Sequence, residues 1–155
     1  MSVAPGTAAP DFSVAADDGA MLRLADYAGR KVVLYFYPKD DTPGCTTEAI
    51  AFTGLGAAFA AADTVVIGMS KDSTASHAKF RAKHSLGVLL GADPDGTVVE
   101  AYGAWVEKSM YGKKYMGIDR STFLIGRDGR IAAVWRKVKV PGHAEAVLKA
   151  AQELG

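Results

Sequence analysis

The sequence predicts one α/β domain spanning residues 1–155, with a mixed β-sheet covered by helices on both faces. Two observations support this fold class. Short apolar runs typical of buried strands alternate with segments of helical periodicity along most of the chain. Two further strand-like runs then flank Arg127-Asp128-Gly129, a tight-turn signal that predicts an antiparallel hairpin. The sequence has no internal repeat, low-complexity tract or linker-like segment, which favours a single domain.

The composition is that of an ordinary globular enzyme and excludes several function classes. Hydrophobic residues make up 49% and charged residues 23% of the 155 residues, and the formal net charge is +1. This balance gives no general attraction to nucleic acid or to a membrane surface. No apolar run approaches the ~20 residues that a membrane span needs. Residues 1–6 lack the pattern of a secretory signal, and one cysteine cannot form an internal disulfide, so we expect a reducing, cytoplasmic setting.

The chain is expected to begin with a hairpin and then to alternate strands and helices. Residues 12–16 and 21–24 flank Asp17-Asp18-Gly19, which is a turn signal. Residues 32–37 form a continuous run of β-branched and aromatic residues, typical of a buried strand, and residues 64–70 form a second one.

A helix is predicted to start directly after the first buried strand. Thr42 is a favoured N-cap residue, and Pro43 suits the first helical position, where its missing N–H is not needed. Cys45 then lies in the first turn, where free backbone N–H groups and the positive end of the helix dipole favour an anion. This position is suited to a cysteine that reacts as a thiolate.

The same helix is expected to run to about residue 62. One of its faces is apolar, although Gly54 and Gly56 lie inside it and each costs roughly 1 kcal/mol relative to alanine. The residues of the apolar face are Phe52, Leu55, Phe59 and Ala62.

The second half of the chain continues the alternation. Asp72 or Ser73 caps a helix over residues 74–83, and residues 88–90 form a short strand that ends at the turn 93–96. A short helix over residues 98–102 is expected next.

The remaining elements are a segment without a clear period, a hairpin and a helix. Residues 105–117 are expected to form a loop or a bent strand. Residues 121–125 and 131–135 are the strands of the predicted hairpin. A helix that begins near His143 closes the chain, with Val147, Ala150, Ala151 and Leu154 on its inner face.

Three separate motifs carry a family resemblance. Pro38-x-x-x-Thr42-x-x-Cys45 resembles the active-site pattern of the peroxiredoxins. The fuller stretch 36–48, together with residues 108–113 and 117–125, is similar to the bacterioferritin comigratory protein, or peroxiredoxin Q, subgroup. The resemblance implies an elaborated thioredoxin-like fold and a thiol-dependent peroxidase that reduces hydrogen peroxide and organic hydroperoxides. It implies neither a metal nor a bound cofactor.

The chemistry of such an enzyme explains why these residue types are required. A thiolate attacks one peroxide oxygen and becomes a sulfenic acid, so the protein must favour the ionised sulfur. By resemblance, Cys45 is the nucleophile, and Arg120 reaches both its sulfur and the peroxide with a fixed fork of donors. The resemblance also implies a bond from the Thr42 hydroxyl to the peroxide and a second-shell role for Glu48, which orients Arg120.

Pro38 and Gly44 complete the site that the resemblance implies. Pro38 is expected to shield the sulfur from water. The backbone N–H of Cys45, next to Gly44, is expected to bind the peroxide.

The chain departs from many relatives at the positions of the resolving cysteine. Ile50 stands where some carry it, and Arg81 stands where others do. A Cys45 sulfenic acid must therefore be reduced by an external thiol, with thioredoxin, glutaredoxin with glutathione, or another small thiol as the alternatives. The resemblance implies a monomer or a weak homodimer, as is common in the subgroup. A redox sensor or peroxide-responsive chaperone that uses the same cysteine is the alternative function.

Other polar and aromatic residues are not expected to take part in this chemistry. Asp40 and Asp41 are expected to be solvated loop charges, and Lys108, Lys113 and Lys114 a solvated face. His77, His84 and His143 show no metal-ligand spacing and are expected at the surface. Trp105, Tyr111 and Trp135 are expected in the core or at a pocket rim.

Overall fold

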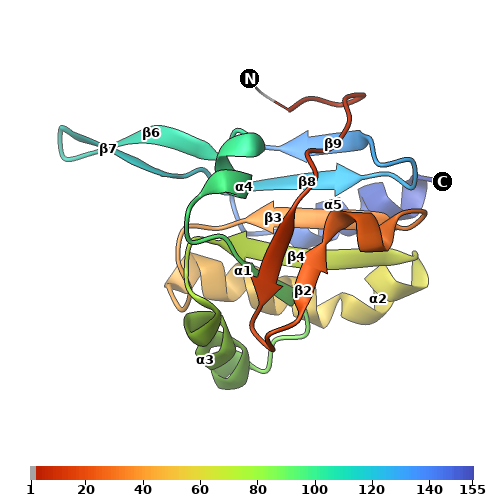
Figure 1. Cartoon of the computed structure of the whole chain (residues 1–155), viewed down its shortest axis with the longest axis horizontal. Coiled ribbons are helices and arrows are strands. Elements are labelled where there is room, and N and C mark those ends of the chain that lie inside the picture. Colours follow the sequence, from red (N-terminus) through yellow and green to blue (C-terminus); the bar gives the residue numbers. More distant parts are fainter. Residues whose placement is uncertain (1–2) are drawn as a thin grey trace.

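The computed structural model describes residues 3–155 and confirms the mixed α/β architecture (Figure 1). A seven-stranded sheet has the order β2-β1-β5-β4-β3-β8-β9, and β6 and β7 form a separate two-stranded ribbon. The strands are β1 (Ser13–Ala16), β2 (Met21–Arg23), β3 (Lys31–Phe36), β4 (Thr64–Ser70), β5 (Leu89–Ala92), β6 (Trp105–Met110), β7 (Lys113–Ile118), β8 (Ser121–Ile125) and β9 (Ile131–Trp135). The helices are the 3-10 helix η1 (Leu24–Tyr27) and α1 (Pro43–Gly54), α2 (Gly56–Ala61), α3 (Thr74–His84), α4 (Thr97–Ala101) and α5 (His143–Glu153).

The centre of the sheet is parallel and its flanks are antiparallel. Strand β4 runs parallel to both β3 and β5, whereas β8 is antiparallel to β3, and β1 is antiparallel to β5. Both predicted hairpins are confirmed, β1–β2 and β8–β9. All six residues of β3 are buried, which explains why its sequence is apolar without alternation.

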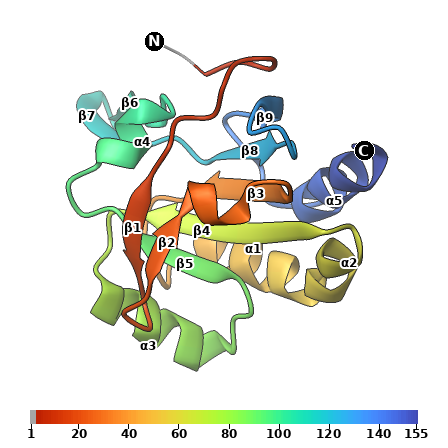
Figure 2. The same ribbon diagram turned by 45° about the vertical axis from the view of Figure 1, so that its right-hand side comes forward.

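The two faces of the sheet are covered differently (Figure 2). Side chains of α1, α2, α3 and α5 pack on the face that carries Val33, Tyr35 and Tyr37. The opposite face, which carries Leu34 and Phe36, is covered by the N-terminal hairpin, α4 and the start of β6. Cys45 belongs to the first of these layers, so its helix lies directly on the central strand.

The long helix predicted to run to residue 62 is two helices. Helix α1 ends at Gly54, Leu55 leaves the helical conformation with φ −97° and ψ 8°, and α2 begins at Gly56. Glycines on both sides of Leu55 make the helical backbone costly at this point. Phe52 and Phe59 nevertheless remain buried on the same face, as the apolar pattern predicted.

Residues 105–118 form an antiparallel ribbon, so the prediction of a loop or bent strand was wrong. The ribbon projects from the body (Figure 1), and its strands have no apolar alternation because most of their side chains are exposed. Its turn is made by Tyr111 and Gly112 with φ of 52° and 77°, the two positive values typical of a tight hairpin. Tyr111 is 97% exposed, which corrects its expected place in the core or at a pocket rim.

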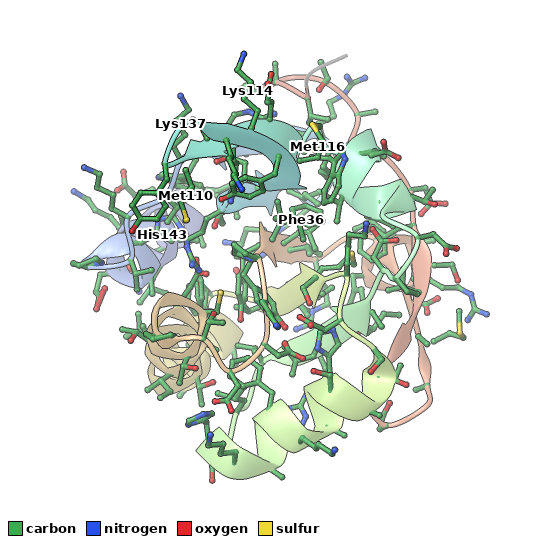
Figure 3. All side chains as sticks on the ribbon, turned by 90° about the vertical axis from the view of Figure 1, so that its left-hand side faces the viewer. Phe36, Met110, Lys114, Met116, Lys137 and His143 are labelled. Atoms are coloured by element: carbon green, nitrogen blue, oxygen red, sulfur yellow. The ribbon has the colours of Figure 1, made fainter. Side chains whose placement is uncertain are left out.

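One face of this ribbon is turned away from the body of the protein and the other is turned towards it. Figure 3 shows Lys114 pointing away from the body, whereas Met110 lies on the side of the ribbon towards His143. Lys113 and Lys114 are exposed, as predicted, whereas Lys108 is half-buried. Within residues 3–155, no helix combines the length and apolar character needed to traverse a bilayer.

Candidate active site

Cys45 lies in the first turn of α1, in the place that the sequence predicted. Thr42 occupies the N-cap position with an extended backbone, Pro43 is the first helical residue, and the Thr46 N–H donates to the Thr42 carbonyl at 2.8 Å. The Thr42 hydroxyl makes no cap bond and donates instead to the Lys39 carbonyl at 2.8 Å. Cys45 is only 1% exposed, so the sulfur is buried beside the free N–H groups of the helix start.

Arg120, in the short link between β7 and β8, reaches this sulfur. Its Nη2 donates to the Cys45 Sγ at 3.4 Å, and its Nη1 donates to the Glu48 Oε1 at 2.7 Å. Although burial alone would lower the pKa of Arg120, the negative charges of Glu48 and Cys45 raise it above its usual value. The guanidinium is therefore a permanent positive charge between the sulfur and the carboxylate.

Glu48, one helical turn after Cys45, is almost completely buried. Its side chain is 1% exposed, and its Oε2 has no hydrogen-bond partner. Burial raises the pKa of Glu48 to about 7, against the opposing attraction of Arg120. The Tyr35 hydroxyl is the other buried polar atom without a partner among the described residues.

Gly44 and Pro38 flank this arrangement. A Cβ on Gly44 would lie 3.1 Å from the Arg120 Nη2, so the absence of a side chain leaves room for the guanidinium. Pro38 is exposed at the end of β3, and its expected shielding of the sulfur stays a prediction.

Replacing Gly44 by alanine should displace the Arg120 guanidinium and slow Cys45 oxidation by about tenfold, since small misplacements of positioning groups are costly. The measurement is the rate of sulfenic acid formation after mixing with hydrogen peroxide. Gly56→Ala is the matched control because a Cβ at Gly56 meets no atom within 4 Å. Equal rates of oxidation in the two variants would mean that the Arg120 guanidinium can accommodate a Cβ at position 44 without losing its position.

Several polar residues expected at the surface are buried, and these predictions were wrong. Asp40 is 8%, His77 0% and His143 7% exposed. The Asp40 carboxylate accepts from the Tyr37 hydroxyl and lies 2.7 Å from the His77 Nδ1. Each of these polar groups is satisfied by a partner distant in sequence, which is why burial is tolerated. The one local signal was the place of His77 on the inner face of α3, three residues before the buried Phe80.

His143 lies at the start of α5, on the same side of the sheet as Cys45. Its Nε2 and the Thr122 Oγ1 are 2.8 Å apart, and its ring meets the rings of Phe52 and Trp135 edge to face. Burial and the nearby Arg120 charge lower the pKa of His143 to about 4, so the ring is neutral at neutral pH.

The two positions where relatives carry a resolving cysteine are occupied differently. Ile50 is 47% exposed on α1. Arg81 is held at the end of α3, where it pairs with Asp17 and donates to the carbonyls of Leu86 and Val88 at 2.7 and 2.8 Å. Arg81 therefore links the end of α3 to Asp17 and to the segment that leads into β5.

No metal centre is apparent in residues 3–155, where no group of three or more His, Cys, Asp or Glu side chains is arranged to hold an ion.

Comparison with known proteins identifies the family. The AhpC/TSA family matches residues 5–134. The chain is 51% identical over 148 residues to a putative peroxiredoxin Bcp of Coxiella burnetii, covering 96% of this chain and 98% of that one. It is 47% identical over 154 residues to the peroxiredoxin Bcp of Bacillus subtilis, covering 99% and 98% of the two chains.

Solved structures agree with this assignment and confirm the thioredoxin-like fold. The bacterioferritin comigratory protein of Xanthomonas campestris superposes with a TM-score of 0.90 at 41% identity, covering 96% of this chain and 98% of that chain. A peroxiredoxin Q structure from the same species gives a TM-score of 0.87 at 44% identity, covering 91% and 89%. The chain therefore belongs to the AhpC/TSA family, as a peroxiredoxin of the bacterioferritin comigratory protein or peroxiredoxin Q type.

Proposed function

We propose that this protein is a thiol-dependent peroxidase in which the Cys45 sulfur is the reacting atom. The observation that carries the proposal is the Arg120 Nη2, 3.4 Å from a sulfur at a helix N-terminus. Two positive influences then act on one thiol, the guanidinium and the helix start, and both favour the nucleophilic thiolate. The Xanthomonas relative is described as an enzyme with alkyl peroxide reduction activity, which supports hydroperoxides as the substrate class.

In the first half of the reaction, the Cys45 thiolate attacks one oxygen of the hydroperoxide. The oxygen–oxygen bond breaks, the sulfur gains that oxygen to become a sulfenic acid, and the other oxygen leaves as an alcohol or water after taking up a proton. Arg120 stabilises the negative charge first on the sulfur and then on the leaving oxygen. Glu48 holds the guanidinium in place through its 2.7 Å bond.

Thr42, Gly44 and Pro38 shape the peroxide site in this proposal. The Thr42 hydroxyl binds the peroxide by leaving the Lys39 carbonyl to which it now donates. Gly44 leaves room for Arg120, and the adjacent Cys45 N–H is the second donor to the peroxide. Pro38 limits the access of water.

An external thiol completes the cycle because this chain contains one cysteine. The thiol attacks the sulfenic sulfur, releases water and forms a mixed disulfide, and a second thiol frees the Cys45 thiolate. Thioredoxin, or glutaredoxin with glutathione, is the proposed reductant, in a reducing compartment such as the cytoplasm. We propose a monomer or a weak homodimer.

The test combines stopped-flow kinetics with intact-mass measurement. Hydrogen peroxide and an alkyl hydroperoxide should each add one oxygen to the wild-type protein, and Cys45→Ser should remain unmodified. Peroxide consumption should continue only while a reducing thiol system is supplied. Stoichiometric oxidation that none of these thiols reverses would instead favour a sensor, and equal consumption by Cys45→Ser would exclude Cys45 as the reacting group.

A further inference from the structure

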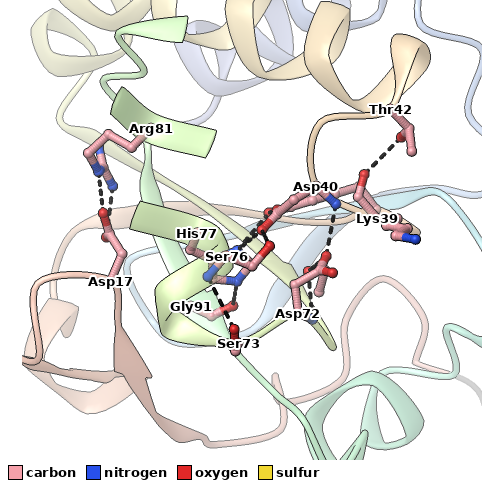
Figure 4. A network of polar contacts seen from close by, with 12 residues as sticks. Asp17, Lys39, Asp40, Thr42, Asp72, Ser73, Ser76, His77, Arg81 and Gly91 are labelled. Carbon is pink, nitrogen blue, oxygen red and sulfur yellow. Dashed lines mark hydrogen bonds and ion pairs between the residues drawn. The ribbon is translucent and has the colours of Figure 1, made fainter. Parts of the chain in front are cut away.

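The loop that joins β3 to the cysteine helix is fixed by a buried polar network (Figure 4). Asp40, at its centre, accepts from the Tyr37 hydroxyl at 2.6 Å and from the Ser76 hydroxyl at 2.8 Å. Its backbone N–H donates to the Asp72 carboxylate at 2.8 Å. The segment after β3, the helix α3 and the link between β4 and α3 therefore all bond to one loop residue, which lies five positions before Cys45.

His77 contributes a full positive charge to this network. Its Nε2 lies 2.9 Å from the Gly91 carbonyl oxygen, which can only accept, so this nitrogen carries a proton. Its Nδ1 lies 2.7 Å from the Asp40 carboxylate, which also accepts. With a proton on both nitrogens the ring is an imidazolium, and it forms an ion pair in which the histidine side chain is 0% and the aspartate side chain 4% exposed.

The surroundings support this charge state. Although burial lowers the pKa of His77, the bond and charge of Asp40, the Gly91 carbonyl and the charge of Asp72 raise it above the usual value. Burial also raises the pKa of Tyr37, so its hydroxyl stays protonated and donates. The charge of His77 also acts on Asp17, which pairs with Arg81. On the solvent side of the loop, Lys83 and His84 pair with Asp41.

The loop needs such an anchor because part of its backbone is unfavourable. Asp41 has a φ of 58°, in the left-handed region that costs a residue with a side chain about 1 kcal/mol or more. Directly after it, Thr42 turns its hydroxyl back to the Lys39 carbonyl and the helix of Cys45 begins. A shift at Asp40 would therefore be passed along two residues to the start of that helix.

We propose that His77 is a positioning residue for Cys45: acting through Asp40, its charged ring holds residues 38–42, and with them the first turn of α1, where the sulfur meets Arg120. The inference rests on the proposed peroxidase function, since it concerns the reactivity of the same sulfur. His77 itself lies on α3, where it contacts Asp40 of the loop and the Gly91 carbonyl of β5, and no hydrogen bond of the described residues joins it to Cys45 or Arg120.

The molecule offers a matched control in the neighbouring residue pair. His84, also on α3, lies 2.8 Å from Asp41, the next residue of the same loop. This contact is open to solvent, with side-chain exposures of 21% and 41%, and Lys83 shares the carboxylate. Solvent-exposed ion pairs of this kind contribute little to stability, so the loss of the His84 side chain should leave the loop conformation unchanged.

The experiment measures the second-order rate of Cys45 sulfenic acid formation in wild type, His77→Gln, Asp40→Asn, the double variant and His84→Gln. We expect His77→Gln and Asp40→Asn to react about tenfold or more slowly, since misplacement of a reacting group has costs of this order. The double variant should be no slower than the slower single one because both residues act through one contact. His84→Gln should remain within about twofold of wild type, as an exposed pair predicts.

The pH dependence separates positioning from a general loss of stability. The wild-type advantage over His77→Gln should be greatest at low pH, where His77 is charged, and should shrink as the pH rises through the raised pKa of His77. A constant ratio across pH, or a folded His77→Gln that reacts at the wild-type rate, would overturn the inference.

A measurement on the wild-type protein covers the case in which the variants do not fold. Amide exchange of residues 40–46, corrected for its intrinsic pH dependence, should accelerate as His77 loses its proton, with that of the β8 core unchanged. Protection that stays constant through this range contradicts the proposal. A wild-type protein that does not react with peroxide at all would count against the proposed function and not against this network.

Discussion

Replacing Arg120 by lysine should slow the oxidation of Cys45 by about 100- to 1,000-fold, the usual effect of losing one preorganised donor to a developing anion. The guanidinium uses one nitrogen for Glu48 and another for the sulfur. An ammonium is a compact point charge without this fork, so it cannot keep both bonds in the same geometry. Stopped-flow measurement of sulfenic acid formation at a fixed pH gives the ratio directly.

Arg127→Lys is the control for this substitution. Arg127 is also paired with a carboxylate, Asp63, and donates to the Gly29 carbonyl, but its side chain is 41% exposed. Its loss should not change the rate of oxidation. If Arg120→Lys reacts within about tenfold of wild type, the positive charge alone is sufficient, and the simultaneous bonds of the guanidinium to Glu48 and to the sulfur are not required.

A second large effect should appear in the pH dependence of stability. The pKa of Glu48 is raised to about 7 in the folded protein because the carboxyl is buried, whereas the unfolded chain has the ordinary value near 4.5. Between these values the folded state keeps a proton that the unfolded chain has released. Stability from this group is therefore complete below about pH 4.5 and is lost as the pH rises through about 7.

Glu48→Gln removes this titration while keeping the shape of the side chain. We expect the wild type to lose about 3 kcal/mol of unfolding free energy relative to Glu48→Gln between about pH 4.5 and 8, at roughly 1.4 kcal/mol for each pKa unit. Urea unfolding of both proteins at several pH values measures the difference. Glu153 is exposed, so the control variant Glu153→Gln should show no such pH-dependent difference in unfolding free energy from wild type. The opposite slope would mean that the attraction of Arg120 outweighs the burial of Glu48.

The parts of the fold that sequence predicted well are those with a local cause. The apolar runs at 32–37 and 64–70 are central strands, the Asp128-Gly129 turn joins two antiparallel strands, and Ser73 caps α3. Each rests on burial, turn geometry or a cap within a few residues. The position of Cys45 in the first turn of its helix followed from Thr42 and Pro43 in the same way.

The features that sequence reasoning missed depend on partners far along the chain. His77 and Asp40 are 37 residues apart in the sequence. Each was expected at the surface because the sequence does not show that the fold brings them into contact. The ribbon was missed because its side chains face solvent on most positions, so burial left no pattern. Arg120 lies 75 residues from Cys45, and only family resemblance predicted their meeting.

The isolated ribbon has a consequence for the behaviour of the protein at high concentration. Among residues 3–155, strands β6 and β7 pair with each other and with no third strand, so each leaves an outer row of backbone groups open to a strand of another molecule. Met110, Tyr111 and Met116 would make such intermolecular pairing favourable. Lys113 and Lys114, exposed beside these apolar side chains, place positive charge at the same edge, and the like charges of a second copy would oppose such pairing.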